Sequence, residues 1–126
     1  MSKLDEMKKF YEQAEKNYDF ANHAQSDDVR EQWQLAGDLA CENGYRKYLE
    51  IKSEIAREKC NLVSKYDDMA YEAMLKGDCD AEKEYNEKIN EISDEWGEED
   101  RKLHAESFAA ECSARRKKDC AEEICR

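Results

Sequence analysis

The 126-residue chain contains no proline, and this absence constrains its fold more than any other feature. Average usage of about 5% would supply roughly six prolines. Only four glycines occur, at positions 37, 44, 77 and 97. Sheet proteins need turns, which draw on Gly, Pro and Asn-Gly pairs about every 8–12 residues. The chain has one Asn-Gly pair, at Asn43-Gly44, and long runs of Glu, Lys, Ala and Leu. The sequence therefore predicts an all-α fold.

Length and composition predict one folded helical domain over residues 1–126, because this length suits one domain and is short for two. Charged residues make up 42% of the chain, a value often found in disordered segments. However, 40% of the residues are apolar, and they recur at helical spacing. We therefore expect a folded core beneath a heavily charged exterior.

Apolar periodicity predicts helices over about 2–24, 28–43, 45–76, 80–96 and 98–124. In the first segment the apolar positions follow the 3-4 spacing of bundle helices, and they are Leu4, Met7, Tyr11, Ala14, Tyr18 and Ala21. The next two segments repeat this spacing at Val29, Trp33, Ala36, Ala40, Tyr48, Ile51, Ile55, Leu62, Tyr66, Met69 and Ala73. The last two place Tyr85, Ile89, Ile92, Trp96, Leu103, Phe108, Ala109 and Cys112 toward a core. The predicted architecture is an elongated bundle of four or five helices with a long antiparallel hairpin.

Local residues predict where these helices begin and end. Gly77 suits the position after a helix C-terminus, with Asp78 or Asp80 capping the next helix. Asp28 with Glu31 forms a capping box, with Ser26 and Asp27 as alternative caps. Gly44 is expected to end a helix or to be tolerated within a longer one. Gly97 is expected to kink or end the fourth helix.

Cysteine usage and the apolar pattern indicate a cytoplasmic protein. The N-terminal residues contain no apolar segment of the secretory type, and no apolar run reaches the roughly 18 residues of a membrane span. The six cysteines, at positions 41, 60, 79, 112, 120 and 125, are therefore expected to be free thiols.

No established metal-binding pattern is present, and no cofactor is predicted. Close Cys pairs and Glu-x2-His motifs are both missing from the sequence. The spacing Asp-x3-His occurs twice, at Asp19/His23 and Asp100/His104, which makes these four residues weak metal-ligand candidates. Exposed Asp–His ion pairs explain them more simply.

Enzymatic activity and direct nucleic-acid binding both lack support. Cys60 and Cys120 follow lysines, which lower a thiol pKa, but no histidine or phosphate-binding loop accompanies them. The basic run Arg115–Lys118 is a small footprint in a chain of net charge −11. Proximity to a helix C-terminus accounts for these cations. No catalytic residue is predicted.

The strongest functional feature is the acidic segment from Gly77 to Asp100. It has eleven acidic residues against two lysines, a net charge of −9 out of −11. A helix advances about 100° per residue, so most of these acids fall on one face, about 27 Å long and away from the expected core. This row, here called the acidic stripe, comprises Asp80, Glu84, Glu87, Glu91, Asp94, Glu95 and Glu98. Further acids at positions 27, 28, 31, 38 and 42 are expected to extend the negative surface.

The acidic stripe admits two interpretations. A solvated helix face whose like charges cost a few tenths of a kcal/mol per pair is the simpler one. The functional one is a non-enzymatic inhibitor, or a nucleic-acid-mimicking decoy of the phage anti-defence or host-takeover type. It would engage a protein with a basic surface, such as a nucleic-acid-binding protein, in the host cytoplasm if the protein is viral. The alternative is a helical scaffold that forms homo-oligomers through apolar helix faces.

Overall fold

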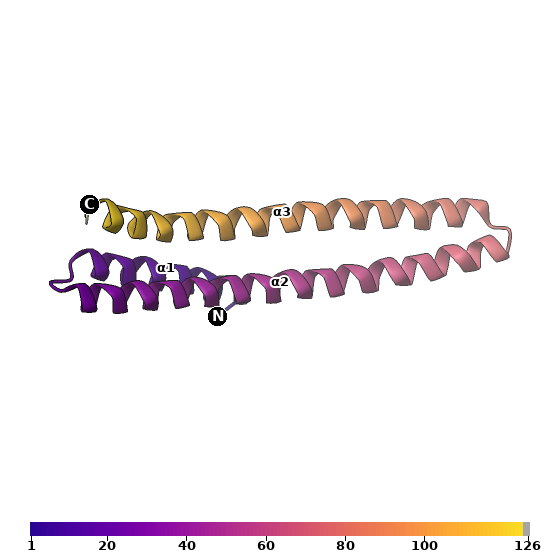
Figure 1. Cartoon of the computed structure of the whole chain (residues 1–126). Helices are drawn as coiled ribbons and strands as arrows, with labels where there is room; N and C mark the ends of the chain where they lie inside the picture. Colours follow the sequence, from indigo (N-terminus) through magenta and orange to yellow (C-terminus); the bar gives the residue numbers. More distant parts are fainter. Residues whose placement is uncertain (125–126) are drawn as a thin grey trace. The chain divides into compact units, whose positions relative to one another are not determined.

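The computed structural model describes residues 1–124, and the side chains of residues 1–119. Three helices make up nearly all of this part of the chain: α1 (Lys3–Asn22), α2 (Asp27–Leu75) and α3 (Cys79–Ile124) (Figure 1). Residues 1–124 contain no strand, so the all-α prediction is confirmed. The predicted count of four or five helices is wrong. The chain divides into two compact units, unit 1 (Met1–Ile51 with Leu103–Arg126) and unit 2 (Lys52–Lys102).

Helix α2 continues through Gly44, which is the second of the two outcomes expected there, and α3 continues through Gly97, where the sequence predicted a kink or an end. Gly44 lies against the ring of Tyr11 from α1, and a Cβ atom there would stand 2.8 Å from Tyr11 Cζ. This glycine therefore makes room for a neighbouring ring. A glycine inside a helix costs only about 1 kcal/mol relative to alanine, which a packed helix tolerates.

The turn between α2 and α3 is the one that the sequence predicts. Gly77 adopts a φ of 74°, in the left-handed region that glycine favours. The amide of Asp78 donates to the carbonyl of Ala73 at 2.9 Å, and that of Gly77 to Met74 at 3.1 Å. This pair of bonds is the Schellman motif. Asp78 Oδ1 then accepts from the amide of Ala81 at 3.1 Å and caps α3.

The N-terminus of α2 is capped by one of the alternatives. Ser26 Oγ accepts a hydrogen bond from the amide of Val29 at 3.3 Å, and the helix begins at Asp27. Asp28 therefore lies inside the first turn, where its negative charge favours the helix dipole.

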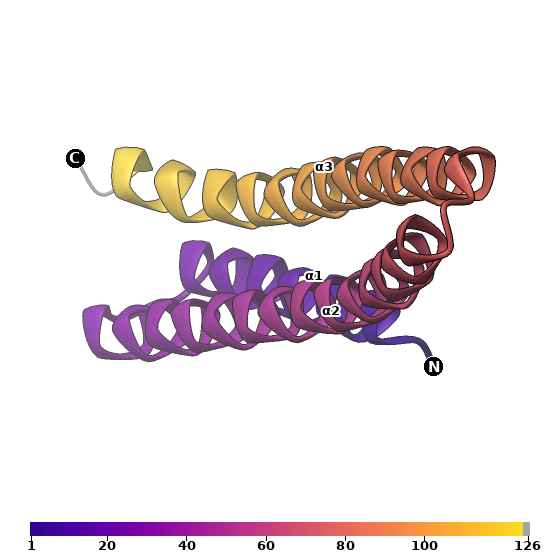
Figure 2. The same ribbon diagram turned by 90° about the vertical axis from the view of Figure 1, so that its right-hand side faces the viewer.

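Unit 1 packs α1 beside the first part of α2 and the last part of α3, as Figures 1 and 2 show for α1 and α2. The predicted inner face of α1 is confirmed, with Met7, Tyr11, Ala14, Tyr18 and Ala21 at most 1% exposed. The helices facing it bury four small side chains, Ala40, Cys41, Ser107 and Ala114, together with Tyr48 and Leu103. The Tyr11 and Tyr18 rings of α1 occupy the space beside these small residues.

Four predicted core residues, one of them Ala109, lie at the surface of unit 1 instead. Phe108 is 60% exposed and stacks on His104 with ring centroids 6.1 Å apart. The inward positions of α3 recur at 103, 107 and 114, so residue 108 faces outward although it is apolar. Val29 and Trp33 are also exposed, and Trp33 packs against Phe20 of α1 at 4.9 Å.

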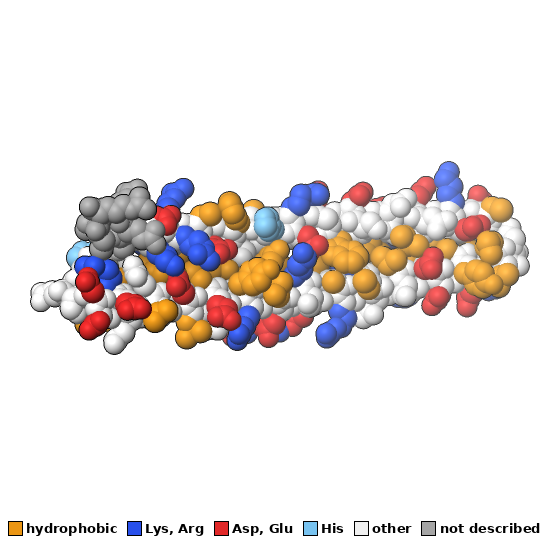
Figure 3. Space-filling view, in the orientation of Figure 1, with side chains coloured by type: hydrophobic (Ala, Val, Ile, Leu, Met, Phe, Trp, Pro, Cys, Tyr) orange, Lys and Arg blue, Asp and Glu red, His pale blue; other side chains and the backbone are white. Residues whose placement is uncertain are grey.

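Unit 2 is an antiparallel hairpin of residues 52–75 and 79–102, which confirms the predicted hairpin. Tyr66 lies 6.3 Å from Tyr85 between ring centroids. The buried residues of this unit are Lys59, Ala70, Ala73 and Ile92, while the other predicted core positions are half-buried. On the visible face of unit 2, hydrophobic side chains follow the line between the two helices (Figure 3). Two helices alone cannot enclose their shared apolar face.

Candidate functional site: the acidic stripe of α3

All seven residues of the acidic stripe are exposed on the part of α3 that belongs to unit 2. Ile92 is buried and Tyr85, Ile89 and Trp96 are half-buried on the opposite face of the same helix. The acidic stripe and the apolar face therefore lie on different sides of α3, as the sequence predicts. The functional role of the stripe stays a prediction.

Among the ion pairs of the described residues, two members of the stripe take part. Glu91 lies 3.7 Å from Lys88 of the same helix, and Glu95 lies 3.5 Å from Lys59 of α2. No ion pair within 4 Å joins the other five members to a described cation, and these are Asp80, Glu84, Glu87, Asp94 and Glu98. Most of the stripe is thus left to solvent.

Lys59 gives Glu95 a structural role that the sequence did not predict. The Lys59 side chain is only 8% exposed, and its ammonium lies 3.5 Å from Glu95 and 3.3 Å from Glu99. Burial by itself lowers the pKa of this ammonium, but the two carboxylates outweigh burial and leave the pKa raised. Lysine is seldom buried unless it is paired. Glu95 therefore helps to hold α3 against α2.

The charge of the chain is unevenly divided between the two units. Unit 2 contains nine Lys and Arg against sixteen Asp and Glu, a net charge of −7 over 51 residues. Unit 1 contains twelve against sixteen, a net charge of −4 over 75 residues. Of the five acids expected to extend the stripe, Asp27, Asp38 and Glu42 pair with cations inside unit 1. The larger share of the net negative charge therefore belongs to unit 2.

The basic run Arg115–Lys118 is used inside unit 1. Arg115 Nε donates to Glu111 at 2.9 Å, and Lys118 Nζ lies 2.9 Å from Asp38 of α2. Lys117 lies 3.8 Å from Asp19 of α1. Helix α3 continues to Ile124, so these cations precede its last turn. The run joins α3 to the two other helices, and the helix dipole is not needed to explain it.

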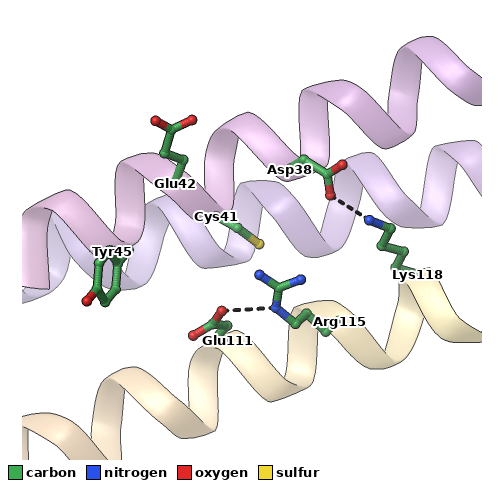
Figure 4. A pocket seen from close by; sticks show the side chains of 7 residues that line it. All are labelled: Asp38, Cys41, Glu42, Tyr45, Glu111, Arg115 and Lys118. Atoms are coloured by element: carbon green, nitrogen blue, oxygen red, sulfur yellow. Dashed lines mark hydrogen bonds and ion pairs between the residues drawn. The ribbon is translucent and has the colours of Figure 1, made fainter.

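An open polar groove of about 550 Å³ lies between α2 and α3 in unit 1 (Figure 4). Its lining residues are Asp38, Cys41, Glu42, Tyr45, Glu111, Arg115 and Lys118. The groove contains two cations and three carboxylates, and the cations bond carboxylates within it (Figure 4). The third carboxylate, Glu42, pairs with Arg46 outside the groove, so every charged group of the lining already has a partner, which does not favour a charged ligand.

Buried groups beside this groove are not arranged for nucleophilic chemistry. The hydroxyl of Tyr18, a fully buried residue, donates to Asp38, which also accepts from Lys118. Burial raises the pKa of the Cys41 thiol, so the reactive thiolate is disfavoured. Burial, followed by the bond to Asp38, raises the pKa of Tyr18. For Asp38, burial acts to raise the pKa, but the bonds from Tyr18 and Lys118 outweigh it and lower the pKa.

The weak metal-ligand candidates do not form a cluster. Within the described part of the chain, no group of three or more His, Cys, Asp and Glu side chains is placed to hold a metal ion. His23 Nδ1 lies 2.8 Å from the carbonyl oxygen of Asp19, and His104 takes part in aromatic contacts with Tyr48 and Phe108. Cys41, Cys60, Cys79 and Cys112 are free, as predicted. The side chains of Cys120 and Cys125 lie outside the described residues.

Comparisons of the chain with models of protein families, with curated proteins and with solved structures found no match. In the described residues, none of the helices combines the length and the apolar character needed to cross a membrane.

Proposed function

We propose that this protein is a non-enzymatic, acidic binding protein that engages the basic surface of another protein through the acidic stripe of α3. An inhibitor or a nucleic-acid-mimicking decoy is the specific form that we favour. The observation that carries the proposal is the row of exposed carboxylates, five of which have no described cation within ion-pair distance. Folding does not require them, and like charges three or four residues apart oppose it.

The decoy form rests on the ordered row of negative charge, which is sparser than that of DNA. Seven carboxylates over about 27 Å of helix give roughly one charge per 4.5 Å, whereas B-DNA carries about one per 1.7 Å of its axis over both strands. A protein that binds DNA through Lys and Arg would meet fewer charges on the stripe than on DNA. The helix, however, holds these charges in an ordered row before binding. A complementary charge row of this kind increases association rates and gives salt-dependent binding.

Self-association through the apolar face of α1, the alternative function, has no support from burial. Met7, Tyr11, Ala14 and Tyr18 are at most 1% exposed and pack inside unit 1. A scaffold role would need another surface.

The test compares two variants with the same change in net charge. In the first, Glu84, Glu87, Asp94 and Glu98 become Lys, which leaves the ion pairs of Glu91 and Glu95 in place. In the second, Asp5, Glu12, Glu106 and Asp119 of unit 1 become Lys. Partners are captured from cell lysate on immobilised protein, eluted with salt, purified and titrated with each chain.

We expect the stripe variant to weaken partner binding at least about tenfold, because like charges then face each other. The unit 1 variant should bind within about threefold of the original, and duplex DNA should compete for the partner if the decoy form is right. Equal losses in both variants, or affinity unchanged between about 50 and 500 mM salt, would contradict the proposal.

A further inference from the structure

The outer face of α2 in unit 1 carries a row of exposed side chains that unit 1 does not cover. Leu35, Leu39 and Leu49 are 61%, 58% and 43% exposed. Glu42 and Arg46 lie between them, and Arg46 Nη2 donates to Glu42 Oε1 at 2.7 Å. The five positions follow one another at intervals of 4, 3, 4 and 3 residues, the spacing of helices that pair in coiled coils. We call these five residues the outer α2 row.

The outer α2 row lies opposite the packed face of the same helix. Ala40, Cys41 and Tyr48 are buried against the other helices of unit 1, about 140–240° around the helix from Leu35. The side chains of Glu42 and Arg46 are 55% and 70% exposed. Single exposed leucines are common on protein surfaces. In the outer α2 row, however, three exposed leucines lie on one helix face, together with the oppositely charged Glu42 and Arg46.

We propose that the outer α2 row binds the same row of a second copy of this chain, with the two helices antiparallel. A two-fold axis at the level of Gly44 places Leu39 of one copy opposite Leu49 of the other. The same register places Glu42 opposite Arg46 of the second copy, and symmetry repeats both contacts. The four members of the row from Leu39 to Leu49 are thus complementary to themselves, as an isologous interface requires, and Leu35 lies at the end of the interface. This dimer surface lies in unit 1 and is separate from the acidic stripe and from its proposed partner.

Charge distinguishes the antiparallel arrangement from the parallel one. In a parallel pair in register, Glu42 faces Glu42 and Arg46 faces Arg46, and both contacts are repulsive. In the antiparallel register both contacts are attractive. Polar residues within an otherwise apolar helix interface commonly select orientation in this way.

The expected dimer is weak. The row covers about four helical turns, and an interface of this size falls below the roughly 1,200 Å² of standard protein complexes. A dissociation constant of about 10 μM to 1 mM is therefore expected. At about 150 mM salt the Debye length is roughly 8 Å, so the long-range repulsion of two acidic chains is screened more than contacts between paired side chains.

Sedimentation equilibrium of the full chain up to about 0.5 mM tests the proposal. The apparent mass should rise from 14.8 kDa toward twice that value. Leu39→Gln should weaken association at least about tenfold. Its control is Leu75→Gln, at a leucine of α2 that is 67% exposed and outside the row, and it should leave association unchanged. A wild-type chain that stays monomeric, or equal effects of the two variants, would overturn the proposal.

Charge variants test the register. Arg46→Glu alone and Glu42→Arg alone should each weaken association at least about tenfold, since each places like charges opposite one another. An equimolar mixture of these two variants should associate about as tightly as the wild type. Arg30→Glu, in an ion pair on the same helix outside the row, is the matched control and should have no effect.

Two results with these variants would overturn the arrangement. If neither single charge variant weakens the dimer, the copies associate through another surface. If the mixture associates far more tightly than the wild type, the charges of the wild type must repel each other, which indicates parallel pairing. Far-UV circular dichroism of each variant verifies that its helices are retained. Both chains of the mixture carry a substitution, so recovered association in the mixture shows that neither substitution prevents folding.

Discussion

Tyr18 connects all three helices of unit 1 through one side chain. Its ring lies against Gly37 of α2, where a Cβ atom would collide with it, and its hydroxyl donates to Asp38. Lys118 of α3 bonds the same carboxylate and lies 5.8 Å from the centroid of the Tyr18 ring. A fully buried hydroxyl needs such a partner, because an unpaired one costs about 1–3 kcal/mol.

This environment predicts how stability depends on alkaline pH. Burial and the bond to Asp38 raise the pKa of Tyr18 above its usual value of 10.0. A group whose pKa is raised by folding contributes stability that is complete below the unfolded-state pKa and is lost as the pH rises above it. The free energy of unfolding should therefore fall above about pH 10.

Tyr18→Phe tests this dependence by urea unfolding. At pH 7 the variant should lose about 1.5–3 kcal/mol, the usual contribution of a hydrogen bond to a charged group. Above about pH 10 its stability should decline less steeply than that of the wild type, because one ionisable group is missing. Tyr45→Phe, at a 51% exposed position, is the control. Parallel declines of wild type and Tyr18→Phe would contradict the assignment.

At the scale of the helices, substitution by alanine should have opposite effects on stability at Gly44 and at Gly97, although both glycines lie inside a helix. Alanine is favoured over glycine in a helix by about 0.8–1 kcal/mol. At Gly97 the nearest side-chain atom to a new Cβ is Arg101 Nη1 at 3.5 Å, which is ordinary contact. At Gly44 the new Cβ would stand 2.8 Å from the buried Tyr11 ring.

We therefore expect Gly97→Ala to raise the free energy of unfolding by up to about 1 kcal/mol. Gly44→Ala should lower it by about 1–3 kcal/mol, because overpacking a buried ring exceeds the gain in helix propensity. Chemical denaturation of both variants measures the difference. Stabilisation by both substitutions would mean that Tyr11 moves aside at little cost.

The same contrast shows which parts of the fold were predictable from the sequence. The α1 face and the Gly77-Asp78 turn follow from local spacing and backbone conformation, and both predictions are confirmed. The contact of Gly44 with Tyr11, which lies 33 positions earlier, cannot be predicted from local rules, and those rules left a helix end at Gly44 as one outcome. Phe108 was placed in the core for its apolarity, whereas the inward positions of α3 take Ser107 and Ala114.

The candidate site was predictable to a similar extent. Exposure of the acidic stripe follows from helix geometry and is observed. The ion pairs of Lys59 with Glu95 and Glu99 were not predicted, because they depend on the register of the hairpin. The sequence contained one usable indication, a lysine at the helical spacing of the apolar residues Ile55, Leu62 and Tyr66. Such a lysine implies an acidic partner on the facing helix.

At the scale of the whole molecule, a net charge of −11 opposes folding through repulsion between like charges. In unit 2 the acidic stripe concentrates this repulsion between like charges. Asp94 shows it most clearly. Glu91 precedes it by three residues and Glu98 follows it by four, and no Lys or Arg occupies either spacing. Carboxylates kept at such positions reduce stability, and selection for binding is one reason for a protein to retain them.

Asp94→Asn should therefore stabilise the protein while weakening partner binding. It relieves two like-charge pairs, each worth about 0.2–0.5 kcal/mol, and Asp and Asn have similar helix propensities. Thermal unfolding should show the gain at about 20 mM salt and little of it at about 500 mM, where charges are screened. Glu98→Gln is the control, because Arg101 and Lys102 lie three and four residues after Glu98 and their attraction is lost as well. If Asp94→Asn gained stability without losing affinity for the captured partner, the carboxylate of Asp94 would have no part in binding, and the proposed surface would have to exclude it.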